Sequence, residues 1–152
     1  AAVGYEMYCH LLEESIITLK NEKKPDAPSA TALEIGISGL IPKGYIPSEQ
    51  RRLEAYRRLA CAFTPEQLSQ LRADLVDAYG EPTPPVQRLF ELSHIRITLA
   101  RLAVRTCTIR EKDIIFLAKD PAPIAQQLNS LAVPNTHVTV LPPKDSLSCW
   151  WI

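Results

Sequence analysis

The chain has 152 residues, 46% of them hydrophobic, and its 17 lysines and arginines balance 17 aspartates and glutamates. This length predicts one domain with a core of its own. A formal net charge of zero argues against a dedicated nucleic-acid binder, and no apolar run is long enough for a transmembrane helix. No signal-peptide pattern is visible, so we expect a cytoplasmic protein that does not contact a membrane.

The residues that usually carry catalysis or bind metals are scattered through the sequence. They are Cys9, Cys61, Cys107 and Cys149, and His10, His94 and His137. Their spacing lacks the short ligand repeats of a zinc site and predicts reduced thiols that are buried or incidental. The common nucleotide-binding, serine-hydrolase and metalloprotease motifs are also missing. We therefore expect no catalytic residue, no metal and no cofactor in this chain.

The chain begins without a methionine and enters a helical pattern almost at once, as is typical of a domain within a larger protein. Apolar residues at helical spacing predict a first helix over residues 4–22, and a proline-containing linker follows at 25–30. Alternation at 33–37 predicts a half-buried strand, where Gly36 and Gly39 indicate a bulge or a close approach. Residues 40–47 are expected to form a loop anchored by apolar side chains.

Three helices are expected next, each with its own start signal. Ser48 is a suitable N-cap for the first. Thr64 and Gln67 form a capping box for the second, with Pro65 at its first position, and Gly80 marks its end. The third begins near Thr83 and runs for about 20 residues. Its apolar stripe is predicted to consist of Leu89, Leu92, Ile95, Leu99 and Leu102.

Short strands are expected after residue 103. Residues 104–109 and 114–117 predict a hairpin, and residues 136–141 predict a further strand. A short helix between them is expected to carry Ile124, Leu128 and Leu131 on its apolar side. We expect residues 1–143 to form the domain and 144–152 a tail. The order of elements predicts an α+β fold, with helices packed on a small, mostly antiparallel sheet.

Four arginines make the helix after Ser48 basic: Arg51, Arg52, Arg57 and Arg58. Their spacing places Arg51 and Arg58 on one side of that helix. Glutamates on the same helix are able to pair with part of this charge. Two interpretations stay open, a face whose charges pair locally and a basic patch that binds nucleic acid.

The following helix carries an acidic face. At about 100° per residue, Glu66 and Asp77 lie on the same side as Gln70, and Asp74 lies about 60° further round. The leucines of this helix point the opposite way, so the acidic face is predicted to be exposed. It either keeps the chain soluble or docks onto arginines of a partner.

Three segments in order resemble the C-terminal region of bacterial transcription-repair coupling factors. They are VGYEMY at residues 3–8, the block from YIP at 45–47 to YRRLA at 56–60, and LVDAYG at 75–80. Order and spacing agree over residues 3–103. The chain departs from the family pattern at Ala78, where Arg is usual, and at Tyr79, where Phe is usual.

The resemblance implies the C-terminal module of an ATP-driven DNA translocase that acts on stalled RNA polymerase and recruits nucleotide excision repair. The motor, with its ATP and Mg²⁺, belongs to the parent protein. In the family this module packs against an excinuclease-B-like N-terminal domain, and it masks the surface that binds the excinuclease-A protein. For such a contact the best candidates here are Asp74 and Asp77, and Glu66 is a weaker one.

Three functions remain to be compared. A regulatory interaction domain agrees with the missing catalytic motifs and with the exposed charged helix. A nucleic-acid-binding module would use the four arginines named above, together with Arg96 and Arg101, but the zero net charge weighs against it. A small independent enzyme has no support in the sequence. We expect the first of these.

Overall fold

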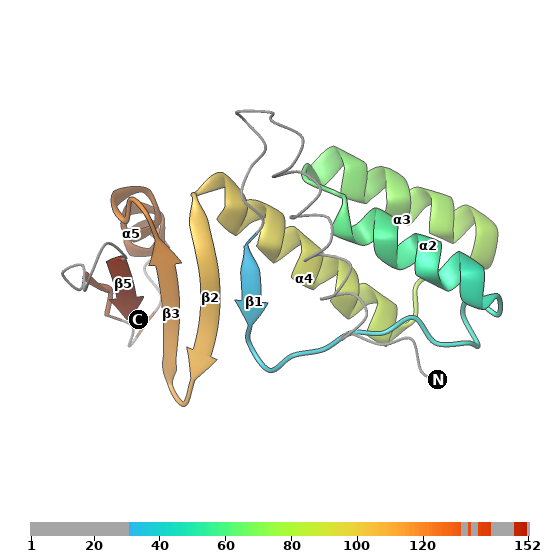
Figure 1. The fold of residues 1–152 in the computed structure, drawn as a ribbon, viewed down its shortest axis with the longest axis horizontal. Coiled ribbons are helices and arrows are strands. Elements are labelled where there is room, and N and C mark those ends of the chain that lie inside the picture. Colours follow the sequence, from blue (N-terminus) through green and yellow to red (C-terminus); the bar gives the residue numbers. More distant parts are fainter. Residues whose placement is uncertain (1–30, 132–133, 135–136, 141–147, 152) are drawn as a thin grey trace. The chain divides into compact units, whose positions relative to one another are not determined.

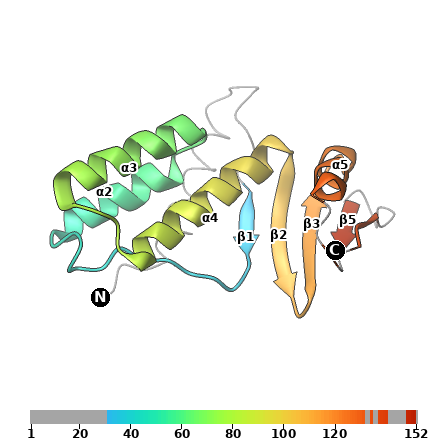
Figure 2. The ribbon, with the colours of Figure 1, turned by 180° about the vertical axis from the view of Figure 1, so that it is seen from behind.

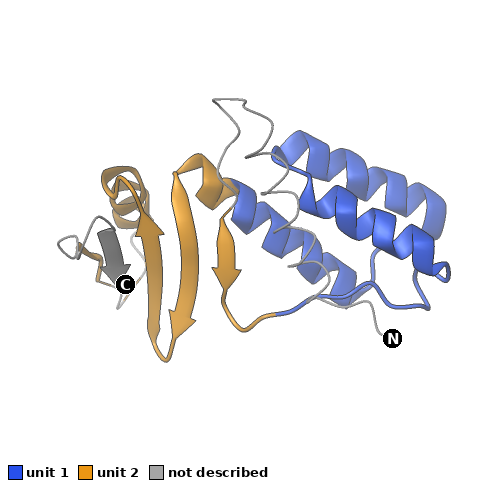
Figure 3. Cartoon of the chain, viewed as in Figure 1, with its two compact units in different colours: residues 1–27, 38–97 blue, residues 28–37, 98–152 orange. Residues whose placement is uncertain are grey.

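A computed structural model describes residues 31–131, 134, 137–140 and 148–151. The fold is α+β, as predicted, and the chain divides into two compact units (Figures 1 and 3). Unit 1 comprises residues 1–27 and 38–97, and unit 2 comprises 28–37 and 98–152, so the boundary between them falls within a helix. The helix expected at residues 4–22 and the linker at 25–30 lie outside the described residues.

Unit 1 contains α2 (Glu49–Ala60), α3 (Pro65–Tyr79) and the larger part of α4 (Pro84–Arg101). The predicted start signals are confirmed. The Ser48 side chain accepts a hydrogen bond from the Arg51 backbone N–H, and both hydrogen bonds of the capping box between Thr64 and Gln67 are present. Both views of the ribbon show α2 and α3 side by side (Figures 1 and 2).

The core of unit 1 is formed by the facing sides of these helices and by the loop that precedes α2. Leu68, Leu71 and Leu75 of α3 are buried, as predicted. The loop is anchored by Ile41, Tyr45 and Ile46, which are all buried. Tyr56 of α2 is fully buried, and its hydroxyl accepts a hydrogen bond of 2.7 Å from the Ile41 backbone N–H. This bond ties the loop to the helix that follows it.

The predicted apolar stripe of α4 is wrong at Ile95, which is 41% exposed. Two polar residues, Ser93 and Arg96, are buried at this level of the helix together with Leu92 and Ile97. Arg96 is drawn inside because its guanidinium donates to two backbone carbonyls at the end of α2, Leu59 O at 3.1 Å and Ala62 O at 2.7 Å. A hydrophobic pattern predicts that an arginine is exposed to solvent. Here the arginine is buried, because the carbonyls at a helix end have no partner within the helix and need a donor.

Unit 2 is built on a five-stranded sheet with the order β1-β2-β3-β5-β4. Its strands are β1 (Ala32–Glu34), β2 (Val104–Arg110), β3 (Asp113–Ala118), β4 (Thr139–Val140) and β5 (Ser148–Trp151). β1 runs parallel to β2, and all other neighbours are antiparallel. The predicted hairpin is therefore confirmed, with Cys107 opposite Phe116.

One face of this sheet is covered by apolar side chains of α5 (Ala122–Ser130) and of the last turns of α4. Cys107, Phe116 and Ala118 of the sheet are buried together with Ile124 of α5 and Leu99 of α4. Leu131, which the sequence pattern placed on the apolar side of α5, is 62% exposed, because the helix ends at Ser130.

The expected tail at residues 144–152 is wrong at residues 148–151, the part of it that the structure describes. Residues 148–151, assigned to a tail, form β5 and lie between β3 and β4 in the sheet. The strand expected at 136–141 is described only as the two residues of β4. A strand of four residues is too short to show a clear periodicity in the sequence. It is specified by pairing with β3, whose partner residues lie 30 to 36 positions earlier in the chain.

Gly39 is predicted to resist substitution because other atoms lie very close to it. A Cβ atom there would lie 2.7 Å from Leu89 Cγ and 2.9 Å from both the Leu89 nitrogen and the Pro85 carbonyl oxygen. Two of these atoms belong to backbone, so Gly39→Ala should lower the free energy of unfolding by about 1–3 kcal/mol. Chemical denaturation measures this, with Gly44→Ala as the control, because nothing lies within 4 Å of a Cβ at Gly44. Equal stabilities of the two variants would contradict the close approach.

Candidate functional site

A groove of about 190 Å³ lies between α2 and α3. Its floor is apolar, since Ala55, Leu71 and Leu75 are buried in the core beneath it. Its rim is charged and carries both signs. The complete lining is Arg51, Glu54, Ala55, Arg58, Leu71, Asp74, Leu75, Ala78 and Tyr79. The predicted placement of Arg51 and Arg58 on one side of their helix is thus confirmed.

An ion pair crosses the groove between Arg58 of α2 and Asp74 of α3. Arg58 Nη2 donates to Asp74 Oδ2, and Gln70 Nε2, one turn earlier in α3, donates to Asp74 Oδ1 at 2.8 Å. Both partners remain accessible, with 44% of the Arg58 side chain and 39% of the Asp74 side chain exposed. The hydrogen bond from Arg58, and after it the one from Gln70, lowers the pKa of the Asp74 carboxyl.

The other two acidic candidates lie at different places on α3. Asp77 is exposed one turn beyond Asp74, and among the described residues the structure records no hydrogen bond or ion pair of its side chain. Glu66 is exposed in the first turn of α3, about 12 Å along the helix axis from Asp74. The three residues therefore do not form one cluster. Asp74 and Asp77 are neighbours, and Glu66 is separate.

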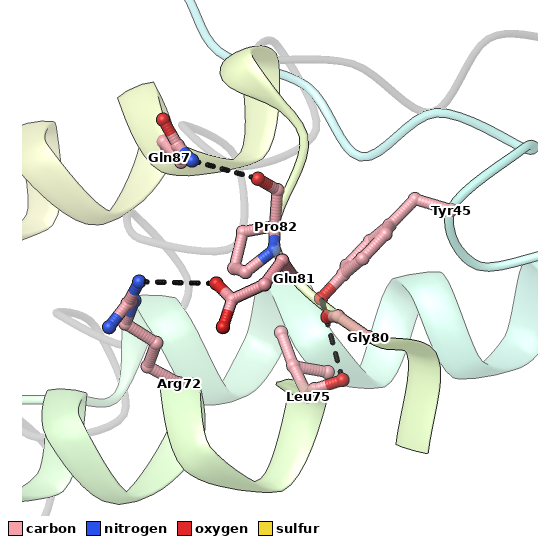
Figure 4. Close-up of polar contacts among 7 residues, drawn as sticks. All are labelled: Tyr45, Arg72, Leu75, Gly80, Glu81, Pro82 and Gln87. Atoms are coloured by element: carbon pink, nitrogen blue, oxygen red, sulfur yellow. Dashed lines mark hydrogen bonds and ion pairs between the residues drawn. The ribbon is translucent and has the colours of Figure 1, made fainter. Parts of the chain in front are cut away.

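The turn after α3 is held from three sides (Figure 4). The Tyr45 hydroxyl has one proton to donate, and it lies 2.9 Å from the Gly80 carbonyl oxygen and 3.4 Å from the Leu75 carbonyl oxygen, so the shorter contact to Gly80 is the main hydrogen bond. Arg72 pairs with Glu81 at 3.6 Å, and the side chain of Gln87 donates to the Pro82 carbonyl at 2.9 Å. Gly80 has φ of 81°, a conformation that glycine adopts without strain. These contacts fix the end of α3, where Asp77 lies.

Tyr45 lies in the loop that was expected to be anchored by apolar side chains, and the role of its hydroxyl is what sequence reasoning missed. Its ring also contacts Tyr79, with the two ring centroids 5.9 Å apart. Burial, and after it the nearby Glu81 carboxylate, raises the pKa of the Tyr45 phenol. The phenol therefore stays protonated to a higher pH than an ordinary tyrosine does, and it remains a hydrogen-bond donor to the end of α3.

The predicted basic patch is wrong in part, because two of the arginines named for it are buried. Arg52 is 2% exposed, and its guanidinium donates to the Ile46 and Pro47 carbonyls at 2.7 and 2.9 Å. Arg96, named with the patch, is 1% exposed. Arg57 lies 3.8 Å from Glu54. Of the arginines on α2, Arg51, Arg57 and Arg58 are exposed, and acidic side chains lie beside the last two, so the surface does not form a continuous basic patch.

No group of three histidine, cysteine, aspartate or glutamate side chains is placed to hold a metal ion within the part of the chain that the structure describes. Cys61 is exposed and Cys107 is buried, and burial raises the pKa of the Cys107 thiol to about 11. His94 is exposed on α4, and His137 is exposed just before β4. None of the described helices is both long and apolar enough to cross a membrane.

The fold of this chain is similar to that of a solved domain. The structure superposes on a solved crystal structure of the C-terminal domain of a transcription-repair coupling factor, with a TM-score of 0.63 and 18% sequence identity. The match covers 81% of this chain and 80% of that one. At this identity the similarity establishes a shared α+β fold.

The family follows from the sequence comparisons. The model of the TRCF domain matches residues 35–128, which is more than half of the chain. The transcription-repair-coupling factor of Myxococcus xanthus is 33% identical over 69% of this chain, and that of Escherichia coli K12 is 28% identical over 72%. The chain belongs to the TRCF domain family. It spans about a tenth of the length of these relatives, 9% and 10% respectively.

The Arg58–Asp74 pair predicts a measurable titration. Because the carboxylate form of Asp74 is stabilised in the fold, its contribution is present above the ordinary aspartate pKa and is lost as the pH falls through the lowered one. In Arg58→Gln the pKa of Asp74 should move up towards its ordinary value, and in Arg57→Gln it should stay low. Carbon NMR of the Asp74 carboxyl group over a pH series measures this pKa in the two variants. An unchanged Asp74 pKa in Arg58→Gln would show that the pair does not persist in solution.

Proposed function

We propose that this chain is a regulatory interaction domain, which docks within its parent protein on the excinuclease-B-like N-terminal domain. In this position it masks the surface that binds the excinuclease-A protein, and its release exposes that surface. The parent protein would be an ATP-dependent DNA translocase of the cytoplasm, whose motor lies outside this chain and binds ATP and Mg²⁺. RNA polymerase and DNA would be partners of the parent and not of this domain.

Membership of the TRCF domain family supports this proposal, since the relatives are transcription-repair-coupling factors. The groove between α2 and α3 supports it on physical grounds. It combines an apolar floor with a charged rim, as interfaces commonly combine an apolar centre with polar edges. Interfaces between domains of one chain are often modest and polar, which suits a contact that has to open.

The observation that carries the proposal is the placement of Asp74 and Asp77 one turn apart at the end of α3. Residues at this spacing lie on neighbouring positions of a helix surface, so both carboxylates are able to face the same partner. The hydrogen bond from Tyr45 to Gly80 and the ion pair between Arg72 and Glu81 keep this end of the helix in place. Carboxylates in a fixed position favour arginines on the partner, and they guide the orientation and rate of docking.

Charge reversal at Asp77 tests this function. In the full-length parent protein, Asp77→Arg should weaken docking of the domain and increase the binding of the excinuclease-A protein, because a partner arginine would then meet a like charge. Glu91→Arg is the matched control, since Glu91 is an exposed residue of α4 and the change in net charge is identical. Pull-down of the excinuclease-A protein, quantified over a salt series, measures the effect.

The size of the effect should depend on salt. Exposed charge pairs are screened by added salt, so the difference between Asp77→Arg and the control should shrink as the salt concentration rises. Adding Asp74→Arg to the first variant should increase the release further. The proposed docking face is wrong if Asp77→Arg and Glu91→Arg bind the excinuclease-A protein equally well at every salt concentration.

A further inference from the structure

The carboxylate of Asp74 already has partners in its own chain. Arg58 donates to one oxygen and Gln70 donates to the other. Asp77 has no such partner among the described residues. The two candidate docking carboxylates therefore differ in one respect, which is that Asp74 is bound by an arginine of the same type that a docking partner would offer.

The Arg58 side chain is free to leave this position. It is 44% exposed, and it comes from the rim of the groove, so that a rotamer change would carry it into solvent without opening the core. Hydrogen bonds from a guanidinium to a carboxylate are among the strong ones. With Arg58 already bound to Oδ2 of Asp74, a guanidinium of the partner has to displace Arg58 to bind this oxygen.

We propose that Arg58 is an internal competitor for Asp74, so that docking exchanges the Arg58–Asp74 pair for a pair between Asp74 and an arginine of the partner. This inference rests on the proposed function and adds a regulatory element to it. Asp77 makes the first contact because it is open, and Asp74 joins only when Arg58 leaves. The competition lowers the affinity of the docked state and keeps the contact easy to release.

Arg58→Gln is then expected to have an unusual effect. Removing an arginine from the face that docks should strengthen docking, since Oδ2 of Asp74 is then free of its cationic partner, while the neutral Gln70 stays on Oδ1. The gain should be about two- to fivefold in Kd, the range of one exposed ion pair. The measurement is calorimetric titration of this chain with the separately produced N-terminal domain of its parent protein.

The matched control is Arg57→Gln. Arg57 is the adjacent residue of α2, is 68% exposed, and has Glu54 of its own helix as its ion-pair partner. It changes the net charge by the same amount, so it measures the general effect of charge on docking. Arg58→Gln should bind more tightly than Arg57→Gln by the factor given above. Equal affinities of the two variants, or weaker binding by Arg58→Gln, would overturn the proposal.

A second probe keeps this test separate from the proposed function. A blocked tri-arginine peptide, added at millimolar concentration, should shift the carboxyl carbon resonance of Asp74 in Arg58→Gln and leave it unchanged in the wild-type chain and in Arg57→Gln. Equal shifts in all three chains would overturn the competition. If none of these chains binds the N-terminal domain, the proposed function fails, and the peptide experiment still decides whether Arg58 protects Asp74.

Discussion

Helix α2 is held at both ends by buried guanidinium groups, and the geometry of unit 1 depends on this arrangement. At its beginning, Arg52 binds the Ile46 and Pro47 carbonyls of the preceding loop. At its end, Arg96 from α4 binds the Leu59 and Ala62 carbonyls, with its guanidinium 5.9 Å from the centre of the Phe63 ring. The carbonyl end of a helix is its negative pole, so the Arg96 cation is favoured there. Hydrogen bonds to charged groups are worth about 1.5–3 kcal/mol each, and loss of either arginine would leave buried carbonyls without a donor.

With α2 fixed in this way, the groove beside α3 has a defined shape. The floor is formed by core residues, and the rim residues project from two helices whose ends are tied. The turn after α3 is tied as well, by Tyr45 on one side and by Arg72 and Gln87 on the other. The proposed docking face holds its charged side chains on fixed helices, and these side chains stay exposed to solvent. Its affinity is then set by a few exposed contacts, each of which is weak and sensitive to salt.

Local sequence signals predicted most of the helices and the hairpin, because a cap or a periodic stripe is complete within a few residues. Ser48, Thr64, Gln67 and Gly80 are examples. The errors arise where a distant part of the chain decides. Arg96 is buried because carbonyls 34 and 37 residues earlier need donors, and β5 exists because β3 offers it an edge. Arg52 is a nearer case, since its partners are carbonyls of the loop just before its own helix. Likewise, helical phase placed Asp74 on the surface but carried no sign of Arg58, which lies 16 residues earlier in the chain.

The face formed by α2 and α3 is proposed to dock on an arginine-bearing surface of the parent protein. Amide NMR of this chain tests this most directly, with the excinuclease-B-like N-terminal domain as the added partner. Docking through this face predicts shifted resonances in residues 51–58 and 71–81, and little change in the hairpin of β2 and β3 or in α5. Shifts confined to the hairpin and α5, with α2 and α3 unaffected, would contradict it.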